Sequence, residues 1–330
     1  MVWASNEHWK FSNYKNFASC NFWKRIVVIV AVAATADVAI PTLEWITKSK
    51  HQLFRVITTP DSKTGRGKVS TASPVALWAD HHNVEVLKPK SHKEMNDAFQ
   101  DVDIVLAIAY GRILPDDLLH IPKHGFLNLH FSLLPAYRGA APVQRSILNG
   151  DVVTGITIFR IDENLDTGPI YVQKVFNVSE NANCQQVLDD LSIIGAHAFE
   201  EVLQMIEEGK DPFPQSEIGV SFAPKVRKEE AKIDWHMPAK KIIDLVRAFN
   251  PNPGVWTLHR GSILKITGAA EEFTGQKLEP GVIRTAGKRL FIGTASNSVE
   301  ILKIVPAGKK EMNAADWING SRLIEGEIFE

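Results

Sequence analysis

Cysteine, long apolar runs and net charge are all scarce in this sequence. Only Cys20 and Cys184 occur among its 330 residues. Two isolated cysteines can build neither a disulfide framework nor a cysteine zinc site, which favours a reducing compartment, so we expect a cytoplasmic protein. No apolar run approaches the roughly 20 residues that span a membrane, and we therefore expect no membrane partner.

The near absence of net charge gives no general indication of a nucleic-acid partner, because the formal charge is −1. The charge is unevenly distributed, however: residues 223–330 carry 17 Lys and Arg against 13 Asp and Glu, a net charge of +4. A basic C-terminal part is compatible with phosphate contacts, but many domains that bind no nucleic acid are equally basic. The length favours two domains, and the apolar fraction of 45% is typical of globular proteins.

The N-terminal segment allows two interpretations. Lys24 and Arg25 precede an apolar stretch, as in a signal peptide, but residues 26–30 are β-branched throughout, which favours a buried strand. We expect residues 1–24 to be an extension and the first strand to run from 26 to 32.

Up to residue 208, short apolar runs alternate with amphipathic stretches, as βαβ units do. We therefore expect an α/β domain over residues 25–208 with a Rossmann-like, mostly parallel sheet. Further strands are expected at 53–58, 84–87, 104–109, 126–130 and 155–161. Helices are expected at 38–48, 74–82, 93–99 and 183–209.

Residues 209–223 contain Pro212 and Pro214, which block helix continuation and indicate a linker. Beyond it, over residues 224–330, one helix is expected at 239–248. Short strands separated by Gly or Pro are expected at 254–259, 263–269, 281–284, 290–293 and 299–305. Such spacing predicts a smaller β-barrel domain.

Asn128 and His130 lie two residues apart on an expected strand, so their side chains share one face. The C-terminal end of that strand is where open α/β sheets bind ligands. An amide beside an imidazole suits a carbonyl oxygen that becomes negative. An isolated Asn-x-His pair is nevertheless more often ordinary surface polarity than a catalytic site.

Three longer motifs favour the catalytic interpretation. His130-Phe-Ser-Leu-Leu-Pro135, Arg138-Gly-Ala-Ala-Pro142 and Leu165-Asp-Thr-Gly-Pro169 occur in that order. Together they resemble the signature of the folate-dependent formyltransferases, and within them the branch that acts on methionyl-tRNA. The resemblance implies a catalytic triad of Asn128, His130 and Asp166. It also implies a formyltransferase enzyme with 10-formyltetrahydrofolate as donor, initiator methionyl-tRNA as acceptor, and no metal.

The implied chemistry matches these side chains. The neutral methionyl amine attacks the formyl carbon, and the tetrahedral oxyanion requires the donors Asn128 and His130, while Asp166 favours the charged imidazole and assists proton removal. The turn after the strand has a backbone that can line a slot for a flat ligand. Its residues are the candidate folate contacts: Ser132, Leu133, Leu134 and Pro135.

Two other regions bear on the tRNA. The segment Gly65-Arg-Gly-Lys68 lacks the spacing of a phosphate-binding loop and by pattern alone is a flexible basic loop. In the family, a matching loop reaches the tRNA acceptor end, which makes Arg66 and Lys68 candidate tRNA contacts. The C-terminal blocks at 228–235, 247–254 and 306–310 resemble the family's second domain, an OB-like barrel that holds tRNA, and we expect a monomer.

The sequence departs from the family pattern at three places. Residues 1–24 have no counterpart, Ala34 replaces a glycine that permits a close turn, and Phe131 stands where a small residue is usual. Alternative functions are formyl transfer to glycinamide ribonucleotide or to a sugar nucleotide, and RNA binding without catalysis. A nicotinamide-dependent dehydrogenase is disfavoured because no Gly-x-Gly-x-x-Gly follows the first strand.

Overall fold

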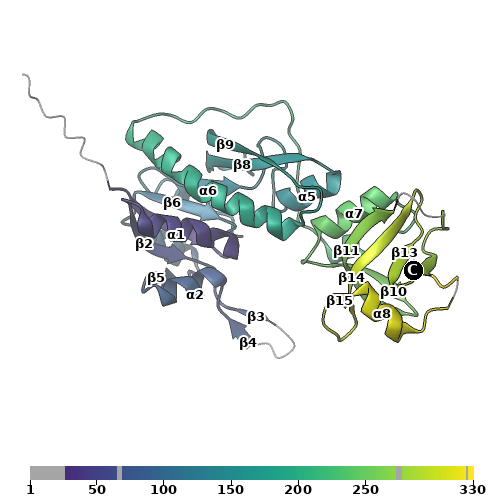
Figure 1. Cartoon of the computed structure of the whole chain (residues 1–330). Helices are drawn as coiled ribbons and strands as arrows, with labels where there is room; N and C mark the ends of the chain where they lie inside the picture. The colour runs from purple at the N-terminus through teal and green to yellow at the C-terminus, as the bar shows by residue number, and fades with distance from the viewer. Residues whose placement is uncertain (1–26, 65–68, 273–276, 325) are drawn as a thin grey trace, which may run out of the picture.

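The computed structural model describes residues 27–64, 69–272, 277–324 and 326–330. Figure 1 shows two domains side by side: an α/β N-terminal domain that ends with the long helix α6, and a smaller, mostly β C-terminal domain. The expected strand-and-helix alternation is therefore confirmed, as is the later change to short strands. The predicted extension over residues 1–24 lies outside the described residues.

A seven-stranded sheet forms the centre of the N-terminal domain, in the order β5-β2-β1-β6-β7-β8-β9. The first five strands pair in parallel, whereas β8 pairs antiparallel with both β7 and β9. The strands are β1 (Ile29–Ala34), β2 (Gln52–Ile57), β5 (Glu85–Leu87), β6 (Ile104–Ile108), β7 (Phe126–His130), β8 (Val153–Arg160) and β9 (Ile170–Asn177). A mostly parallel sheet is thus confirmed, with two antiparallel strands at one edge.

Both faces of this sheet are covered, which is why β1 and β6 are apolar at every position. In β1, Val30 and Val32 face one core while Ala31 and Ala33 face the other. The first core contains the helices η1 (Asp37–Ala39), α1 (Ile40–Lys48), α2 (Pro74–His81), α5 (Pro142–Asn149) and α6 (Cys184–Glu207). The second contains α3 (His92–Ala98) and α4 (Asp116–Leu119).

The same alternation sets the faces of β7. Leu127 and Leu129 face α6, and the backbone of α6 approaches closely at Gly195, where a Cβ would lie 2.4 Å from the Leu129 Cδ2 atom. Phe126 faces the opposite core. Asn128 and His130 follow Phe126 at intervals of two and therefore lie on that second face.

The differences from the expected elements have local causes. β1 begins at Ile29 rather than Ile26 and continues to Ala34. Sequence patterning missed α5, whose N-cap residue Ala141 makes no side-chain capping bond, and also β9, which is buried only over its first three residues and interrupted by Gln173 and Lys174. It also missed the short hairpin of β3 (Ser62–Thr64) and β4 (Val69–Thr71), which projects from the body in Figure 1.

The C-terminal domain is an antiparallel sheet whose two outer strands are joined by the chain end. Its sheet order is β10-β11-β14-β13-β12, with β15 beside β14. Its elements are η2 (Lys228–Ala231), α7 (Ala239–Ala248), β10 (Val255–His259), β11 (Ser262–Glu272), β12 (Ile283–Ala286), β13 (Arg289–Ile292), β14 (Ser298–Pro306), β15 (Met312–Asn313) and α8 (Ala314–Ser321). Glu330 exchanges backbone hydrogen bonds with Leu258 of β10, and Glu327 accepts one from Ile283 of β12. The chain end thus closes the sheet in the manner of the expected barrel.

The two domains share one apolar core and a charged contact. α5 packs against α7, and Arg145 of α5 binds Glu230 of η2 with an Nη1 to Oε2 distance of 2.6 Å. The Arg145 side chain also donates to the backbone carbonyl oxygens of Pro224 and Lys225. The hydrogen bond from Arg145 to the Glu230 carboxylate is the main reason that the pKa of Glu230 falls to about 2, and the Arg227 N–H adds to it. Within the described ranges, none of the helices has the length and apolarity to cross a membrane.

Candidate active site

Asn128 and His130 are placed by β7, as the sequence predicted. Their neighbours on β8 are Phe159 and Thr157, so both side chains lie at an inner position of the sheet. His130 is 5% exposed, whereas Asn128 is half-buried. Among the described residues, none hydrogen-bonds the Asn128 amide, which leaves its N–H groups available to a ligand.

The imidazole of His130 has a defined tautomer. Its Nε2 atom lies 2.9 Å from the carbonyl oxygen of Tyr137, and because a carbonyl only accepts, Nε2 carries the proton. Burial lowers the pKa of His130 below its ordinary value of 6.5, although the Asp166 carboxylate and the Tyr137 hydrogen bond act in the opposite direction. The folded protein therefore favours a neutral imidazole with a free lone pair on Nδ1, where the sequence predicts a protonated or proton-sharing imidazole beside Asp166.

Asp166 comes from the loop between β8 and β9 and faces that lone pair. Its Oδ2 atom is 3.7 Å from His130 Nδ1 and accepts a hydrogen bond of 2.7 Å from the Gly139 N–H. The backbone of Asp166 has a φ of +52°, in the left-handed region that an aspartate seldom occupies. The structure thus brings together two of the three predicted polar residues, on the face that Asn128 shares.

Several backbone groups of the candidate folate turn hydrogen-bond to side chains of the protein itself. Ser132 and Leu134 are buried. The Thr157 hydroxyl donates to the Ser132 carbonyl oxygen and accepts from the Leu134 N–H, and the Gln173 amide donates to the Leu134 carbonyl oxygen. Leu133 and Pro135 are half-buried and are the more accessible members of the turn.

Beside β7 lies the switch point of the sheet, at the carboxyl ends of β1 and β6. Strand order reverses between β1 and β6, and ligands of open α/β sheets bind outside the carboxyl ends of such strands. There the Thr35 hydroxyl donates to the Tyr110 carbonyl oxygen at 2.9 Å. Thr35 and Tyr110 are far apart in the sequence, so no local pattern brings them together. Only the strand order places them at the same edge of the sheet.

The departures from the family pattern have simple structural accounts. Ala34 is the fully buried last residue of β1 and is outside the left-handed region, so alanine causes no backbone strain there. Phe131 is 7% exposed and packs in the first core. It therefore lies beneath the sheet rather than across the ligand crevice.

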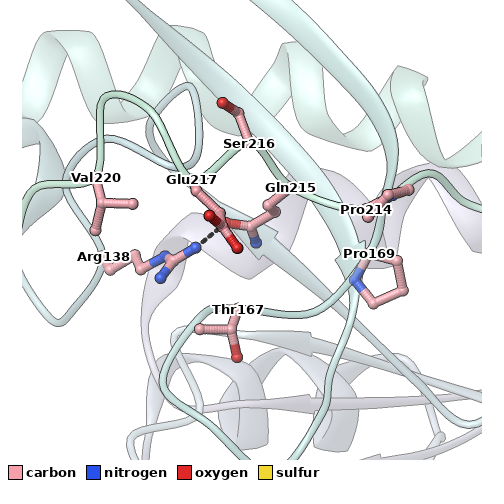
Figure 2. A pocket seen from close by; sticks show the side chains of 8 residues that line it. All are labelled: Arg138, Thr167, Pro169, Pro214, Gln215, Ser216, Glu217 and Val220. Atoms are coloured by element: carbon pink, nitrogen blue, oxygen red, sulfur yellow. Dashed lines mark hydrogen bonds between the residues drawn. The ribbon is translucent and has the colours of Figure 1, made fainter.

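A cavity of about 300 Å³ adjoins the Asp166 loop. Figure 2 shows that one side comes from Arg138, Thr167 and Pro169, and the other from the segment before the C-terminal domain. Residues 209–223 were predicted only as a linker, yet five of them line this cavity: Pro214, Gln215, Ser216, Glu217 and Val220. Its wall is therefore built from segments that are distant in sequence.

The other predicted contacts are less defined. Arg66 and Lys68 lie outside the described residues, and in the sequence they fall between β3 and β4. In the block at 306–310, whose basic residues Lys309 and Lys310 are further candidates for phosphate contacts, both side chains are exposed after β14. In the described part of the chain, no three His, Cys, Asp or Glu side chains are grouped so that they could hold a metal ion.

Comparison with known proteins yields two family models and several relatives. A formyl transferase model matches residues 24–203, and a formyl transferase C-terminal domain model matches residues 225–322. The methionyl-tRNA formyltransferase of Salinispora tropica is 42% identical over 305 residues, which cover 91% of this chain and 99% of the relative.

Solved structures show a shared fold. An N-formyltransferase from Helicobacter canadensis, in complex with folinic acid and dTDP-3-aminofucose, aligns with a TM-score of 0.64 and 21% identity, over 84% of this chain and 99% of that one. HypX from Aquifex aeolicus, in complex with tetrahydrofolic acid, aligns with a TM-score of 0.63 and 17% identity over 91% of this chain. The alignment covers 48% of HypX, so this chain spans about half the length of that protein.

Proposed function

This chain belongs to the formyl transferase family, and we propose that it transfers the formyl group of 10-formyltetrahydrofolate to the α-amine of methionyl-initiator tRNA. The observation that carries the proposal is the His130 and Asp166 pair beside the free Asn128 amide, at the carboxyl end of β7. The 42% sequence identity to a methionyl-tRNA formyltransferase, over 91% of this chain, supports methionyl-tRNA as the acceptor.

The donor follows from the family and from the site. Two proteins of the same fold hold folates, namely folinic acid and tetrahydrofolic acid. We place the folate of this chain in the crevice between the carboxyl ends of β1, β6 and β7, with Leu133 and Pro135 of the following turn within its reach. Ser132 and Leu134 shape that turn from within the core.

The proposed reaction uses each polar group once. The neutral amine attacks the formyl carbon, and the Asn128 N–H groups stabilise the oxyanion. His130 takes the amine proton on Nδ1, and the Asp166 carboxylate stabilises the imidazolium that forms. The bond between the formyl carbon and N10 then breaks, and the proton passes to N10, which leaves tetrahydrofolate and N-formylmethionyl-tRNA.

The cavity beside Asp166 is the proposed place for the aminoacyl end of the acceptor. At about 300 Å³ it falls in the range of small-ligand sites, and Thr167 in its wall directly follows Asp166. The C-terminal domain, together with Arg66 and Lys68, is proposed to bind the tRNA backbone, which makes binding dependent on salt. We propose that the protein acts as a monomer.

Formyl transfer to a sugar nucleotide is the main alternative, because the Helicobacter canadensis structure holds dTDP-3-aminofucose. Its identity to this chain is 21%, against 42% for the Salinispora tropica relative, and the C-terminal family model covers residues 225–322 here. These observations favour the tRNA acceptor over a sugar nucleotide or glycinamide ribonucleotide.

A direct assay tests the acceptor. Purified protein is incubated with 10-formyltetrahydrofolate and, in parallel, with charged initiator tRNA, glycinamide ribonucleotide or a dTDP-amino sugar. We expect formylation of methionyl-tRNA alone. Turnover of either small acceptor in place of the tRNA would overturn the assignment, and tight tRNA binding without any turnover would support the non-catalytic alternative.

A further inference from the structure

The segment at residues 209–223 does more than connect the two domains, because it pairs with the N-terminal domain on both sides of Asp166. Phe213 exchanges backbone hydrogen bonds with Ile170, just after the Asp166 loop. Farther along, the Ser221 carbonyl oxygen accepts from the Arg138 N–H at 2.9 Å, and the Ala223 N–H donates to the Arg138 carbonyl oxygen at 2.7 Å. The residues between these two attachments pass directly over the loop that carries Asp166.

Gln215 occupies the middle of this span. Its Nε2 atom donates to two carbonyl oxygens of the loop, that of Asp166 at 2.8 Å and that of Gly168 at 2.9 Å. Its Oε1 atom accepts from Arg138 Nη2 at 2.7 Å, the bond drawn in Figure 2. Because Arg138 only donates, it orients the Gln215 amide so that the NH2 group faces the loop.

The two contacts that hold Asp166 both depend on this segment. Gln215 holds the backbone of Asp166, and the Gly139 N–H holds its carboxylate. Gly139 has a φ of +124°, and a Cβ there would lie 2.7 Å from the Ala223 carbonyl oxygen. These are the hydrogen bonds that Asp166 itself makes among the described residues, while the Thr167 hydroxyl braces the same loop by donating to Asp162 Oδ1 at 2.7 Å. The left-handed conformation of Asp166 therefore depends in good part on the 209–223 segment.

We propose that Gln215 is a positioning residue for formyl transfer, and that its two donated hydrogen bonds set the placement of the Asp166 carboxylate relative to His130. The inference rests on the proposed function. Gln215 itself touches no reacting atom in this scheme, since it binds the backbone of the loop. Its effect is therefore expected on the chemical step and on the ionisation of His130, rather than on binding of the tRNA.

Two variants separate hydrogen-bond donation from simple packing. Gln215→Ala removes the side chain, whereas Gln215→Glu keeps its size and its acceptor for Arg138 but cannot donate to the two carbonyl oxygens. Gln204→Ala is the matched control, because Gln204 is an exposed residue of α6 whose amide bonds only Glu208. We expect both Gln215 variants to lower kcat roughly 10- to 100-fold, with KM for methionyl-tRNA changed less than about threefold.

The pKa of His130 supplies a second readout. It does not change when a variant merely contains less folded protein. Asp166 is the charged group that raises the pKa of His130 against burial, so its displacement lowers that pKa further. NMR titration of the His130 ring should therefore move to lower pH in Gln215→Ala and stay unchanged in Gln204→Ala. Gln215→Glu is compared by kcat, because its added carboxylate raises the pKa of a nearby histidine. This titration does not require activity, so it tests the positioning role even if the wild-type protein formylates no tRNA.

The outcomes discriminate between the two proposals. An inactive wild-type protein, with the His130 titration still shifted in Gln215→Ala, would contradict the proposed function and leave the positioning role supported. An active wild-type protein whose Gln215→Glu variant keeps the wild-type kcat and whose Gln215→Ala variant keeps the wild-type His130 titration would overturn the positioning role alone.

Discussion

β7 and the segment at residues 209–223 border the same site, but they are recognised from sequence to very different degrees. Asn128 and His130 lie on β7, a buried strand whose alternation of side-chain faces can be recognised from consecutive residues. The later segment reaches Asp166 through Gln215, which lies 49 residues from it in sequence. The comparison indicates that the placement of Asn128 and His130 on one face follows from local pattern, while the contacts that hold Asp166 beside them follow from long-range packing.

The largest expected effect tests the β7 half of this comparison. Asn128→Ala removes the proposed oxyanion donor, and Asp166→Ala removes the partner of His130, so each should lower kcat by about 100- to 1,000-fold, equivalent to about 2.7–4 kcal/mol. Single-turnover formylation of methionyl-tRNA measures it, with thermal unfolding to verify the fold. Asn164→Ala is the control, because this exposed residue uses only its backbone N–H in a hydrogen bond. A near-wild-type rate in Asn128→Ala would remove the amide from the mechanism.

The extent of correct prediction follows the same division. β7 was predicted to the residue, and so was α7, because each has a single apolar periodicity over its full length. The Asp166 conformation was not predicted, since a positive φ in a Leu-Asp-Thr-Gly loop leaves no local signal beyond the glycine. Gln215 was treated as part of a linker because Pro-Phe-Pro-Gln-Ser-Glu has no periodicity, and its partners are assigned only by the fold.

The second-largest expected effect tests the close approach of the 209–223 segment to Gly139. Gly139→Ala places a Cβ 2.7 Å from the Ala223 carbonyl oxygen, at a φ that L residues rarely adopt. We expect the free energy of unfolding to fall by about 1–3 kcal/mol and kcat to fall roughly 10- to 100-fold, as the Gly139 N–H leaves Asp166. Urea denaturation and steady-state kinetics measure the two. Gly209→Ala is the matched control, with a positive φ of +69° but no atom within 4 Å. Equal losses of activity in both variants would contradict a special role for the contact.

The third effect concerns the neutral imidazole on β7. Because the folded pKa of His130 lies below 6.5, His130 should stay neutral as the pH falls through 6.5 and become protonated only at lower pH. Its proton-accepting role then predicts that kcat/KM loses up to about tenfold per pH unit below that pKa. Asp166→Asn should lower the pKa of His130, as seen by NMR. A titration at or above 6.5 in the wild-type protein would mean that the charge of Asp166 outweighs burial.

The smallest effect is expected where the later segment enters the C-terminal domain. Arg145→Met breaks the bond with Glu230 and frees the carbonyl oxygens of Pro224 and Lys225, and we expect a loss of about 1–2 kcal/mol in the free energy of unfolding. Urea denaturation at pH 7 measures it, with Lys174→Met, which breaks a more exposed ion pair, as a control expected to cost about 0.5 kcal/mol or less.

The pH dependence of this contact has a defined sign. The pKa of Glu230 is depressed from 4.5 to about 2, so its stabilisation is complete above pH 4.5 and is lost as the pH falls towards 2. The difference in stability between wild type and Glu230→Gln should therefore shrink over that range. If Arg145→Met also lowered kcat as far as Gly139→Ala does, the attachment at Pro224 would contribute to the placement of Asp166, and the positioning contacts would extend into the domain junction.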